Sequence, residues 1–179
     1  QAFKPSVLLV VPRVLEKVYN AASSKAGGGI KGRMFAWSAK QARTFSVASE
    51  KTFGPGLFKK MRHGIADALV LKKIRSVLGP NLRYIVSGGA PLATDLAHFY
   101  AGMGITLIQG YGLSETTGPI AVQHIGKNPV GGVGLPLPGN FIKIAKDGEI
   151  LVRGQSVMPG YYHLPEQTAE VMPDGKWFH

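Results

Sequence analysis

Cysteine is absent from the 179 residues of this chain. Its absence excludes disulfide bonds, thiolate metal sites and cysteine nucleophiles, and it suits the reducing cytosol, which is the location we expect. Long apolar runs are missing as well. The longest, residues 7–11, is far too short to cross a bilayer, and no signal peptide is visible.

Acidic residues are scarce in the first part of the chain. Residues 1–75 hold 3 Asp and Glu against 15 Lys and Arg, whereas residues 76–179 hold 7 against 6. Such a basic region could contact nucleic acid, anionic lipid or a phosphorylated substrate. We favour the plainer interpretation of a solvated helical surface, with peripheral contact to an anionic membrane as the second option. Nucleic acid is disfavoured, because the aromatic residues between the basic ones have apolar neighbours and core packing explains them as well.

Both ends of the chain suggest that it is a piece of a longer protein. It opens at Gln1 without a methionine, and it stops directly after a turn at residues 173–176, where a strand should begin. We therefore expect parts of any functional site to lie outside these residues.

The basic region predicts one strand followed by helices. A short apolar run closed by Pro12 indicates a buried strand, and Pro12 suits the first turn of the helix that follows. Glycine and proline clusters then separate the helical segments. The predicted elements are a strand at 6–11, a helix ending at 27–29, a helix at 34–48, a break at 53–56 and a helix at 65–78.

The next segment alternates between strand and helix. We predict strands at 83–86 and 105–109, joined by a turn at 87–91 and by a helix that Thr94 or Asp95 caps and that runs through Met103. This order is typical of a βαβ unit in a parallel sheet with flanking helices, an α/β fold. Because ligands bind beyond the carboxyl ends of such strands, the loops at 87–90 and 109–112 should lie side by side at a ligand site.

After about residue 124 the composition changes to closely spaced proline and glycine. Two alternating apolar segments, 141–144 and 149–153, flank Asp147 and Gly148, a pair typical of a tight hairpin turn. We predict a small antiparallel β subdomain over residues 124–179, after a larger α/β subdomain over residues 1–123.

The stretch LIQGYGLSETTGP, residues 107–119, carries the candidate chemistry. Gly110 and Gly112 would let a flat ligand approach the backbone, and Tyr111 offers a ring for base stacking. Gln109 could contact a base edge. Hydroxyl groups for phosphate oxygens come from Ser114, Thr116 and Thr117.

Glu115 is the acidic residue of this stretch, and its carboxylate suits Mg²⁺, which binds proteins through one or two carboxylates together with substrate phosphates. A structural interpretation is equally open at this point. Ser114 could cap a helix, with Glu115 stabilised near the positive end of the helix dipole.

A resemblance to a known family favours the nucleotide site. Residues 109–116 closely resemble the adenine and magnesium motif of the adenylate-forming superfamily, which includes acyl-CoA synthetases, luciferases and peptide-synthetase adenylation domains. Residues 20–78 favour its long-chain fatty acyl-CoA synthetase branch, as an internal fragment of the N-terminal domain. Other segments that resemble the family in order are 11–17, 87–92, 132–136, 148–154, 158–162 and 177–179.

The resemblance implies an AMP-forming acid–thiol ligase that uses ATP, Mg²⁺ and coenzyme A. A fatty acid would attack the α-phosphate of ATP to give acyl-AMP and pyrophosphate, and coenzyme A would then displace AMP. The implied nucleotide-binding residues are Gly88, Gly89, Ala90, Gln109, Gly110, Tyr111 and Gly112, and the implied catalytic residues are Ser114, Glu115 and Thr116, with Glu115 on the metal.

The family's phosphate loop and its C-terminal domain are not found in this sequence. We therefore expect the 179-residue piece alone to be inactive. Two alternatives remain: a basic module that binds membrane or nucleic acid without catalysis, and a sibling enzyme that adenylates another carboxylate or loads a carrier protein. His98, Phe99 and Tyr100 could line an acyl tunnel, although core packing is the safer interpretation.

Overall fold

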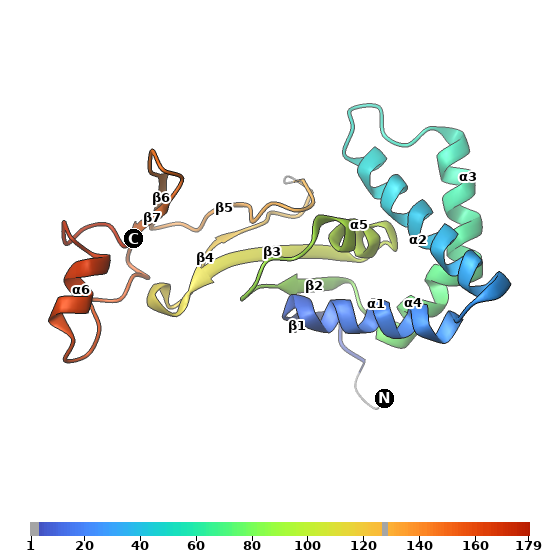
Figure 1. Cartoon of the computed structure of the whole chain (residues 1–179). Helices are drawn as coiled ribbons and strands as arrows, with labels where there is room; N and C mark the ends of the chain where they lie inside the picture. The colour runs from blue at the N-terminus through green and yellow to red at the C-terminus, as the bar shows by residue number, and fades with distance from the viewer. Residues whose placement is uncertain (1–3, 127–128) are drawn as a thin grey trace.

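A five-stranded mixed sheet runs through the chain (Figure 1). The computed structural model describes residues 4–126 and 129–179. The strands lie in chain order, and the first two pairings are parallel while the last two are antiparallel. They are β1 (Val7–Val10), β2 (Tyr84–Ser87), β3 (Thr106–Leu113), β4 (Gly118–Val122) and β5 (Leu135–Pro136).

The connection from β1 to β2 is a long helical crossover, which forms the right-hand lobe in Figure 1. Pro12 begins α1, as the sequence predicts, and Gly27 ends it with a φ of 65° that favours glycine. The break expected at residues 53–56 is also present. The helices are α1 (Pro12–Ala26), α2 (Gly29–Ser49), α3 (Leu57–Ala66), the π-helical segment η1 (Asp67–Leu71) and α4 (Lys72–Leu78).

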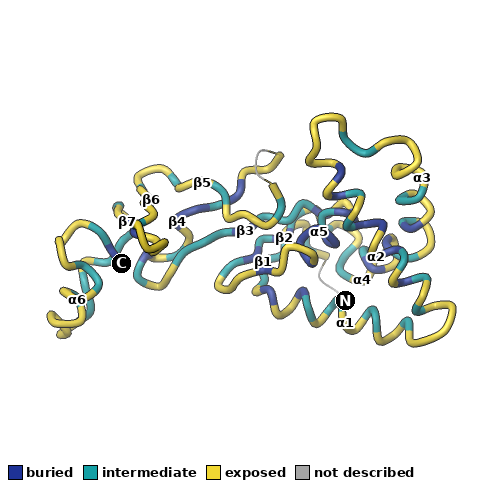
Figure 2. The backbone as a smooth tube through the Cα atoms, turned by 45° about the horizontal axis from the view of Figure 1, so that its top comes forward, coloured by how far each residue is buried: buried dark blue, intermediate teal, exposed yellow. Residues whose placement is uncertain are grey.

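The main core lies between this crossover, the parallel strands and α5 (Thr94–Gly102), and the dark blue segments of Figure 2 follow it. Leu15, Ile85 and Phe99 are at most 1% exposed within it. Tyr100 is fully buried, and its hydroxyl donates to the carbonyl oxygen of Leu15 over 2.8 Å. These contacts pack α1, β2 and α5 around one core.

A smaller lobe follows the main sheet and contains the antiparallel hairpin expected from the sequence. β6 (Asn140–Ile144) pairs with β7 (Ile150–Gly154), and α6 (Pro165–Val171) packs nearby. Ile120 of β4 shares a second apolar cluster with Val152 and Phe178, so this lobe is attached to the main sheet. β5 belongs to the five-stranded sheet although it follows residue 124. The boundary between an α/β subdomain and a β subdomain at residues 123 and 124 therefore stays a prediction.

Several expected boundaries were wrong. β3 continues to Leu113 instead of ending at Gln109, because β4 offers a second partner strand and the chain continues as a hairpin. α5 begins at Thr94 after Ala93, and within the described residues neither Thr94 nor Asp95 caps it through a side chain. Ser114 begins a single 3₁₀ turn, η2 (Ser114–Thr116), with Leu113 in the preceding position, so it does not cap a helix.

Across the described residues, no helix is both long and apolar enough to cross a bilayer.

Candidate functional site

The carboxyl ends of the parallel strands meet at one edge of the sheet, as the βαβ pattern predicts. Val10 of β1, Ser87 of β2 and Gln109 of β3 are neighbours in register. A side chain at Gly88 would come within 3.4 Å of the carbonyl oxygen of Gly110. The loop after β2 and residues 109–112, which belong to β3 and not to a loop, therefore lie side by side.

The loop after β2 leaves an open backbone at this edge. Gly89 has a φ of +78°, which strongly favours glycine, and both Gly89 and Ala90 are exposed. Backbone groups of Gly88, Gly89 and Ala90 are thus presented at the edge where a ligand would lie. This geometry is compatible with a loop that contacts a nucleotide or an acyl head group.

Two residues with buried polar side chains are neighbours at this edge of the sheet. Ser87 is 2% exposed and Gln109 is 6% exposed, and their register places both side chains on the same face of the sheet. The Ser87 hydroxyl and Gln109 Nε2 have no hydrogen-bond partner among residues 4–126 and 129–179. Because unpaired buried polar groups are costly and rare, this pair is where a polar ligand or water is expected.

A residue not singled out from the sequence, Gln123, fixes the backbone of Gln109. The amide of Gln109 donates to Gln123 Oε1 over 2.8 Å, and the amide of Gln123 donates to the carbonyl oxygen of Gln109 over 2.9 Å. Gln123 is 8% exposed, and its Nε2 donates to the carbonyl oxygen of Pro129. Nothing in the local pattern around residue 123 marks it, because its partner lies on another strand.

The glycines around Tyr111 have different structural roles. A Cβ at Gly112 would lie 2.0 Å from the carbonyl oxygen of Gly118, so this glycine is required by the close approach of β4 at a β-bulge. A Cβ at Gly110 would meet its nearest atom at 3.6 Å, an ordinary contact. Tyr111 is half-buried and packs against the second apolar cluster. The sequence suggests that Gly112 lets a ligand approach the backbone. In the structure this glycine also makes room for β4.

Glu115 lies on the turn between β3 and β4 and is held by the chain that follows β7. Its carbonyl oxygen accepts from the amide of Met158 over 2.7 Å, and its Oε1 accepts from the hydroxyl of Tyr161 over 2.9 Å. This hydrogen bond to Glu115 raises the pKa of Tyr161. The motif at residues 158–162 was noticed in the sequence, but the contact between Tyr161 and Glu115 depends on the tertiary fold.

The two hydroxyl residues beside Glu115 differ in exposure. Ser114 is exposed and can reach a ligand. Thr116 is fully buried, and its Oγ1 accepts from the amide of Leu113 and lies 2.8 Å from the carbonyl oxygen of Gly118. In this conformation Thr116 closes the turn, and its catalytic role stays a prediction.

These residues could bind a magnesium ion only together with oxygen atoms of a substrate. Among the residues that the structure describes, no group of three or more His, Cys, Asp and Glu gathers that could hold a metal unaided. Glu115 is half-exposed and offers a carboxylate. One carboxylate with the remaining positions on substrate phosphates is a usual arrangement for Mg²⁺.

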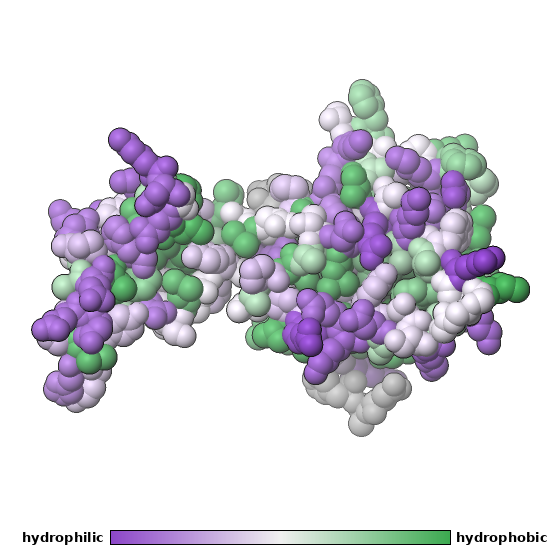
Figure 3. All heavy atoms as spheres, viewed as in Figure 1, coloured by the Kyte–Doolittle hydropathy of each residue, from purple (hydrophilic) through white to green (hydrophobic). Residues whose placement is uncertain are grey.

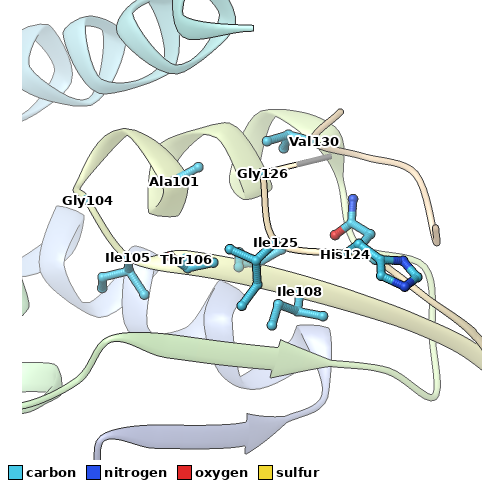
Figure 4. A pocket seen from close by; sticks show the side chains of 11 residues that line it. Ala101, Gly104, Ile105, Thr106, Ile108, His124, Ile125, Gly126 and Val130 are labelled. Carbon is cyan, nitrogen blue, oxygen red and sulfur yellow. The ribbon is translucent and has the colours of Figure 1, made fainter. Parts of the chain in front are cut away.

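A cavity of about 290 Å³ opens along the first half of β3 (Figure 4), and none of the predicted site residues lines it. Its lining combines Ala101 of α5, Ile105 and Ile108 with residues 123–126. We place the candidate site at the strand ends instead, because the unpaired polar pair and the exposed glycine loop lie there.

The residues weighed for an acyl tunnel are packing residues. Phe99 and Tyr100 are at most 1% exposed. His98 is 7% exposed, and its Nδ1 lies 3.0 Å from the Ser46 hydroxyl of α2. The safer of the two interpretations is therefore supported, since His98 joins α5 to α2 while Phe99 and Tyr100 join it to α1.

Comparison with known families gives a match over most of the chain. The profile described as "AMP-binding enzyme" matches residues 1–162. The long-chain-fatty-acid–CoA ligase FadD15 of Mycobacterium bovis is 49% identical over 176 residues, which cover 98% of this chain and 29% of that protein. Long chain acyl-CoA synthetase 8 of Arabidopsis thaliana is 34% identical, with 99% of this chain and 27% of that protein covered. The chain thus spans less than a third of these relatives.

Solved structures show the same fold. The anthranilate CoA ligase AuaEII in complex with anthranoyl-AMP matches with a TM-score of 0.57 at 19% identity, over 99% of this chain and 26% of that one. The o-succinylbenzoate CoA synthetase of Bacillus subtilis, in complex with an acyl-adenylate, matches with a TM-score of 0.51 at 26% identity, over 61% and 25%. The α/β sheet with flanking helices and a small antiparallel sheet is thus the architecture expected from the sequence.

Proposed function

Because this chain belongs to the family of AMP-binding enzymes, we propose that it forms part of an ATP-dependent long-chain fatty acid–CoA ligase. The reaction would join a fatty acid to ATP, giving acyl-AMP and pyrophosphate, and coenzyme A would then replace AMP to give a thioester. The observation that carries the proposal is the meeting of the Gly88 loop with residues 109–112 above two unpaired buried polar groups. The names of its relatives support the substrate class.

The protein's contribution to the first step is positioning and charge stabilisation. The open backbone at Gly88, Gly89 and Ala90 would line the nucleotide and the acyl head. The backbone of residues 109–112, which Gln123 holds at Gln109 and β4 holds at the other residues, would contact adenine beside Tyr111. Ser114 is exposed beside Glu115 and would touch the α-phosphate.

Glu115 would hold Mg²⁺ together with the phosphates. When bound, the ion would neutralise phosphate charge. The Tyr161 hydroxyl occupies one carboxylate oxygen and orients the carboxylate, so the other oxygen can face the metal. Coenzyme A would enter as the second substrate.

We propose that the 179-residue chain by itself does not turn over, because the phosphate loop found in the family is absent from its sequence. The competing proposal is that the protein adenylates another type of carboxylate or transfers the acyl group to a carrier protein. The substrates and products compared in the test distinguish these activities from the fatty acid–CoA ligase reaction.

The test is fatty-acid-dependent exchange of pyrophosphate into ATP by the complete protein that carries this chain. Carboxylates of increasing length would be compared in the parent, in Glu115→Ala and in Glu166→Ala, a control that removes an exposed carboxylate of α6. We expect exchange with long chains, a loss of at least about a hundredfold in Glu115→Ala, and no loss in Glu166→Ala.

Near-normal exchange in Glu115→Ala would overturn the assignment of this residue. Exchange that appears only with short or aromatic carboxylates would favour a sibling activity. Exchange without thioester formation would point to an acceptor other than coenzyme A.

A further inference from the structure

Large apolar side chains are exposed on the loop between α2 and α3 and on the outer side of α3. We name these residues the α3 surface. Phe53 is 99% exposed and Leu57 is 85% exposed, which is extreme for side chains of this size. The α3 surface consists of Phe53, Leu57, Phe58, Met61 and Ile65, the last three of which are 64%, 56% and 48% exposed.

The spacing of the helix explains why these side chains point outward together. Leu57, Met61 and Ile65 recur at four-residue intervals and share one face of α3. The opposite face is anchored to the rest of the protein. Ala66 is fully buried, and His63 stacks on Phe45 at 4.0 Å and donates from Nε2 to the carbonyl oxygen of Gly102 over 2.6 Å. A helix fixed on one side thus presents an apolar stripe on the other.

The charges around the stripe are all positive. Residues 51–66 contain Lys51, Lys59, Lys60 and Arg62 and no acidic residue. The flanking acids are engaged elsewhere, since Glu50 accepts from the amide of Val130 over 2.6 Å and Asp67 pairs with Arg75. Figure 3 shows hydrophobic side chains at the top of the right-hand lobe, with strongly polar ones beside them.

We propose that the α3 surface binds to the surface of an anionic lipid bilayer. A stripe of aliphatic and aromatic side chains flanked by lysine and arginine is the composition of helices that lie in the membrane interface. The apolar residues would enter the acyl boundary, and Lys51 and Lys60 would meet anionic head groups. This proposal narrows the membrane contact expected of the whole basic region 1–75 to one loop and one helix face.

A nucleic acid fits this surface less well than a bilayer does. Aromatic rings can stack on bases, but the aliphatic side chains of Leu57, Met61 and Ile65 cannot. Arg62 is also partly engaged, because its guanidinium lies 5.5 Å from the ring centre of Phe58 and 5.9 Å from that of Trp37. The apolar area therefore favours lipid as the occupant.

The position of the surface leaves the candidate site accessible. α3 lies at one end of the molecule and the turn between β3 and β4 lies toward the other lobe (Figure 1). Docking through α3 would therefore hold the protein at a membrane without covering Glu115. The inference does not depend on the ligase reaction, although membrane-dissolved fatty acids would make such docking useful.

The test is co-sedimentation of the complete protein with phosphatidylcholine vesicles, with and without phosphatidylglycerol, at low and high salt. Phe53→Ser with Leu57→Ser removes apolar contacts, and Lys51→Glu with Lys60→Glu reverses charge. The matched controls are Ile30→Ser, which is 84% exposed at the far end of α2, and Lys143→Glu with Lys146→Glu in the other lobe. Ile30 lies about 30 Å along α2 from its last residue.

We expect binding only to the anionic vesicles and weaker binding at high salt. Each α3-surface double variant should lower the partition coefficient at least about tenfold, and the controls should leave it unchanged. Pyrophosphate exchange in detergent solution should be equal in all variants, which separates a failure of docking from a failure of the proposed ligase activity.

Equal binding of the α3-surface variants and the controls would overturn the proposal, and so would equal binding to neutral and anionic vesicles. Binding to a soluble polyanion with the affinity of vesicles, insensitive to Phe53→Ser with Leu57→Ser, would replace the lipid with a polyanionic partner and would also overturn it.

Discussion

At the scale of single residues, the carboxylate of Glu115 is oriented by Tyr161, which comes 46 positions later in the chain. The hydrogen bond raises the pKa of the Tyr161 phenol above its ordinary value, so the phenol stays protonated and able to donate throughout the neutral range. Residues that orient a metal ligand in this way commonly affect metal affinity strongly when they are changed.

We therefore expect Tyr161→Phe to weaken the proposed use of Mg²⁺ by the complete protein. The magnesium concentration needed for half-maximal pyrophosphate exchange should rise about tenfold. Tyr162→Phe is the control, because Tyr162 is 87% exposed and its ring meets that of the neighbouring His163 edge to face. An unchanged magnesium dependence in Tyr161→Phe would show that this contact does not serve the metal.

Gly112 and Gly88 offer a second comparison at this scale. Gly112→Ala would place a methyl group 2.0 Å from the carbonyl oxygen of Gly118, so the hairpin must shift, and we expect a loss of about 1–3 kcal/mol of stability. Gly88→Ala meets its nearest atom at 3.4 Å and should fold with little change. Urea unfolding of both variants, followed by circular dichroism, measures the difference, and equal midpoints would contradict the steric argument.

The sequence marks candidate site residues but not their conformations. The motif at 109–116 and the neighbouring Gly88 loop could be recognised, because glycine and hydroxyl residues cluster there along the chain. The extension of β3 through Leu113 could not, because it depends on pairing with β4. Gln123 and Tyr161 were missed as site residues for the same reason, since their roles arise from contacts between distant segments.

At the scale of secondary-structure elements, local rules worked where glycine and proline mark boundaries. Pro12, Gly27 and the break at 53–56 end or begin elements as expected. The helix expected at 65–78 is instead the end of a longer unit that starts at Leu57 and includes the π-helical turn η1. A π-helical turn depends on tertiary contacts that a periodic pattern does not reveal.

Asp67 at the start of this π-helical turn is paired with Arg75 of α4, whose Nη2 donates to Asp67 Oδ2 over 2.9 Å. Arg75 Nη1 also donates to the carbonyl oxygen of Met103, so the pair joins the crossover to the end of α5. The hydrogen bond from Arg75 lowers the pKa of Asp67 in the folded state, and its stabilising effect is therefore complete above the carboxyl group's ordinary pKa and is lost as the pH falls through the lowered value.

We expect Asp67→Asn to destabilise the chain by about 1–2 kcal/mol at neutral pH. The difference from the parent should shrink as the solution is acidified, because the parent's Asp67 is then protonated. Urea midpoints at a series of pH values measure this, with Asp95→Asn on α5 as a control. A penalty that stays constant down to strongly acidic pH would show that the ion pair is not its source.

At the scale of the whole molecule, the sheet ends at β1, beside which the described residues place no further strand. β1 forms one end of the strand order, and the side chains of one of its faces are exposed, with Val7 at 54% and Leu9 at 77%. Parallel sheets are usually covered on both faces. An apolar edge strand of this kind readily pairs with other chains.

We therefore expect the isolated 179-residue chain to self-associate as its concentration rises. Leu9→Lys should increase the monomer fraction, because a charged side chain on an edge strand opposes pairing. Sedimentation velocity over a concentration series measures this, and Tyr162→Lys, which places a charge at an equally exposed position in the other lobe, is the control. Equal gains from both substitutions would mean that net charge and not the β1 edge controls association.

The long crossover between β1 and β2 has a consequence for the evolution of this protein. The two strands pair from Val7 with Tyr84 to Val10 with Ser87, and residues 53–56 take no part in this pairing. The loop around Phe53 lies at the far end of that crossover, so insertions, deletions and changes of surface chemistry there can accumulate without disturbing the strand register beneath the candidate site. Natural selection can thus change this outer loop while the strand ends that carry the candidate site are inherited unchanged.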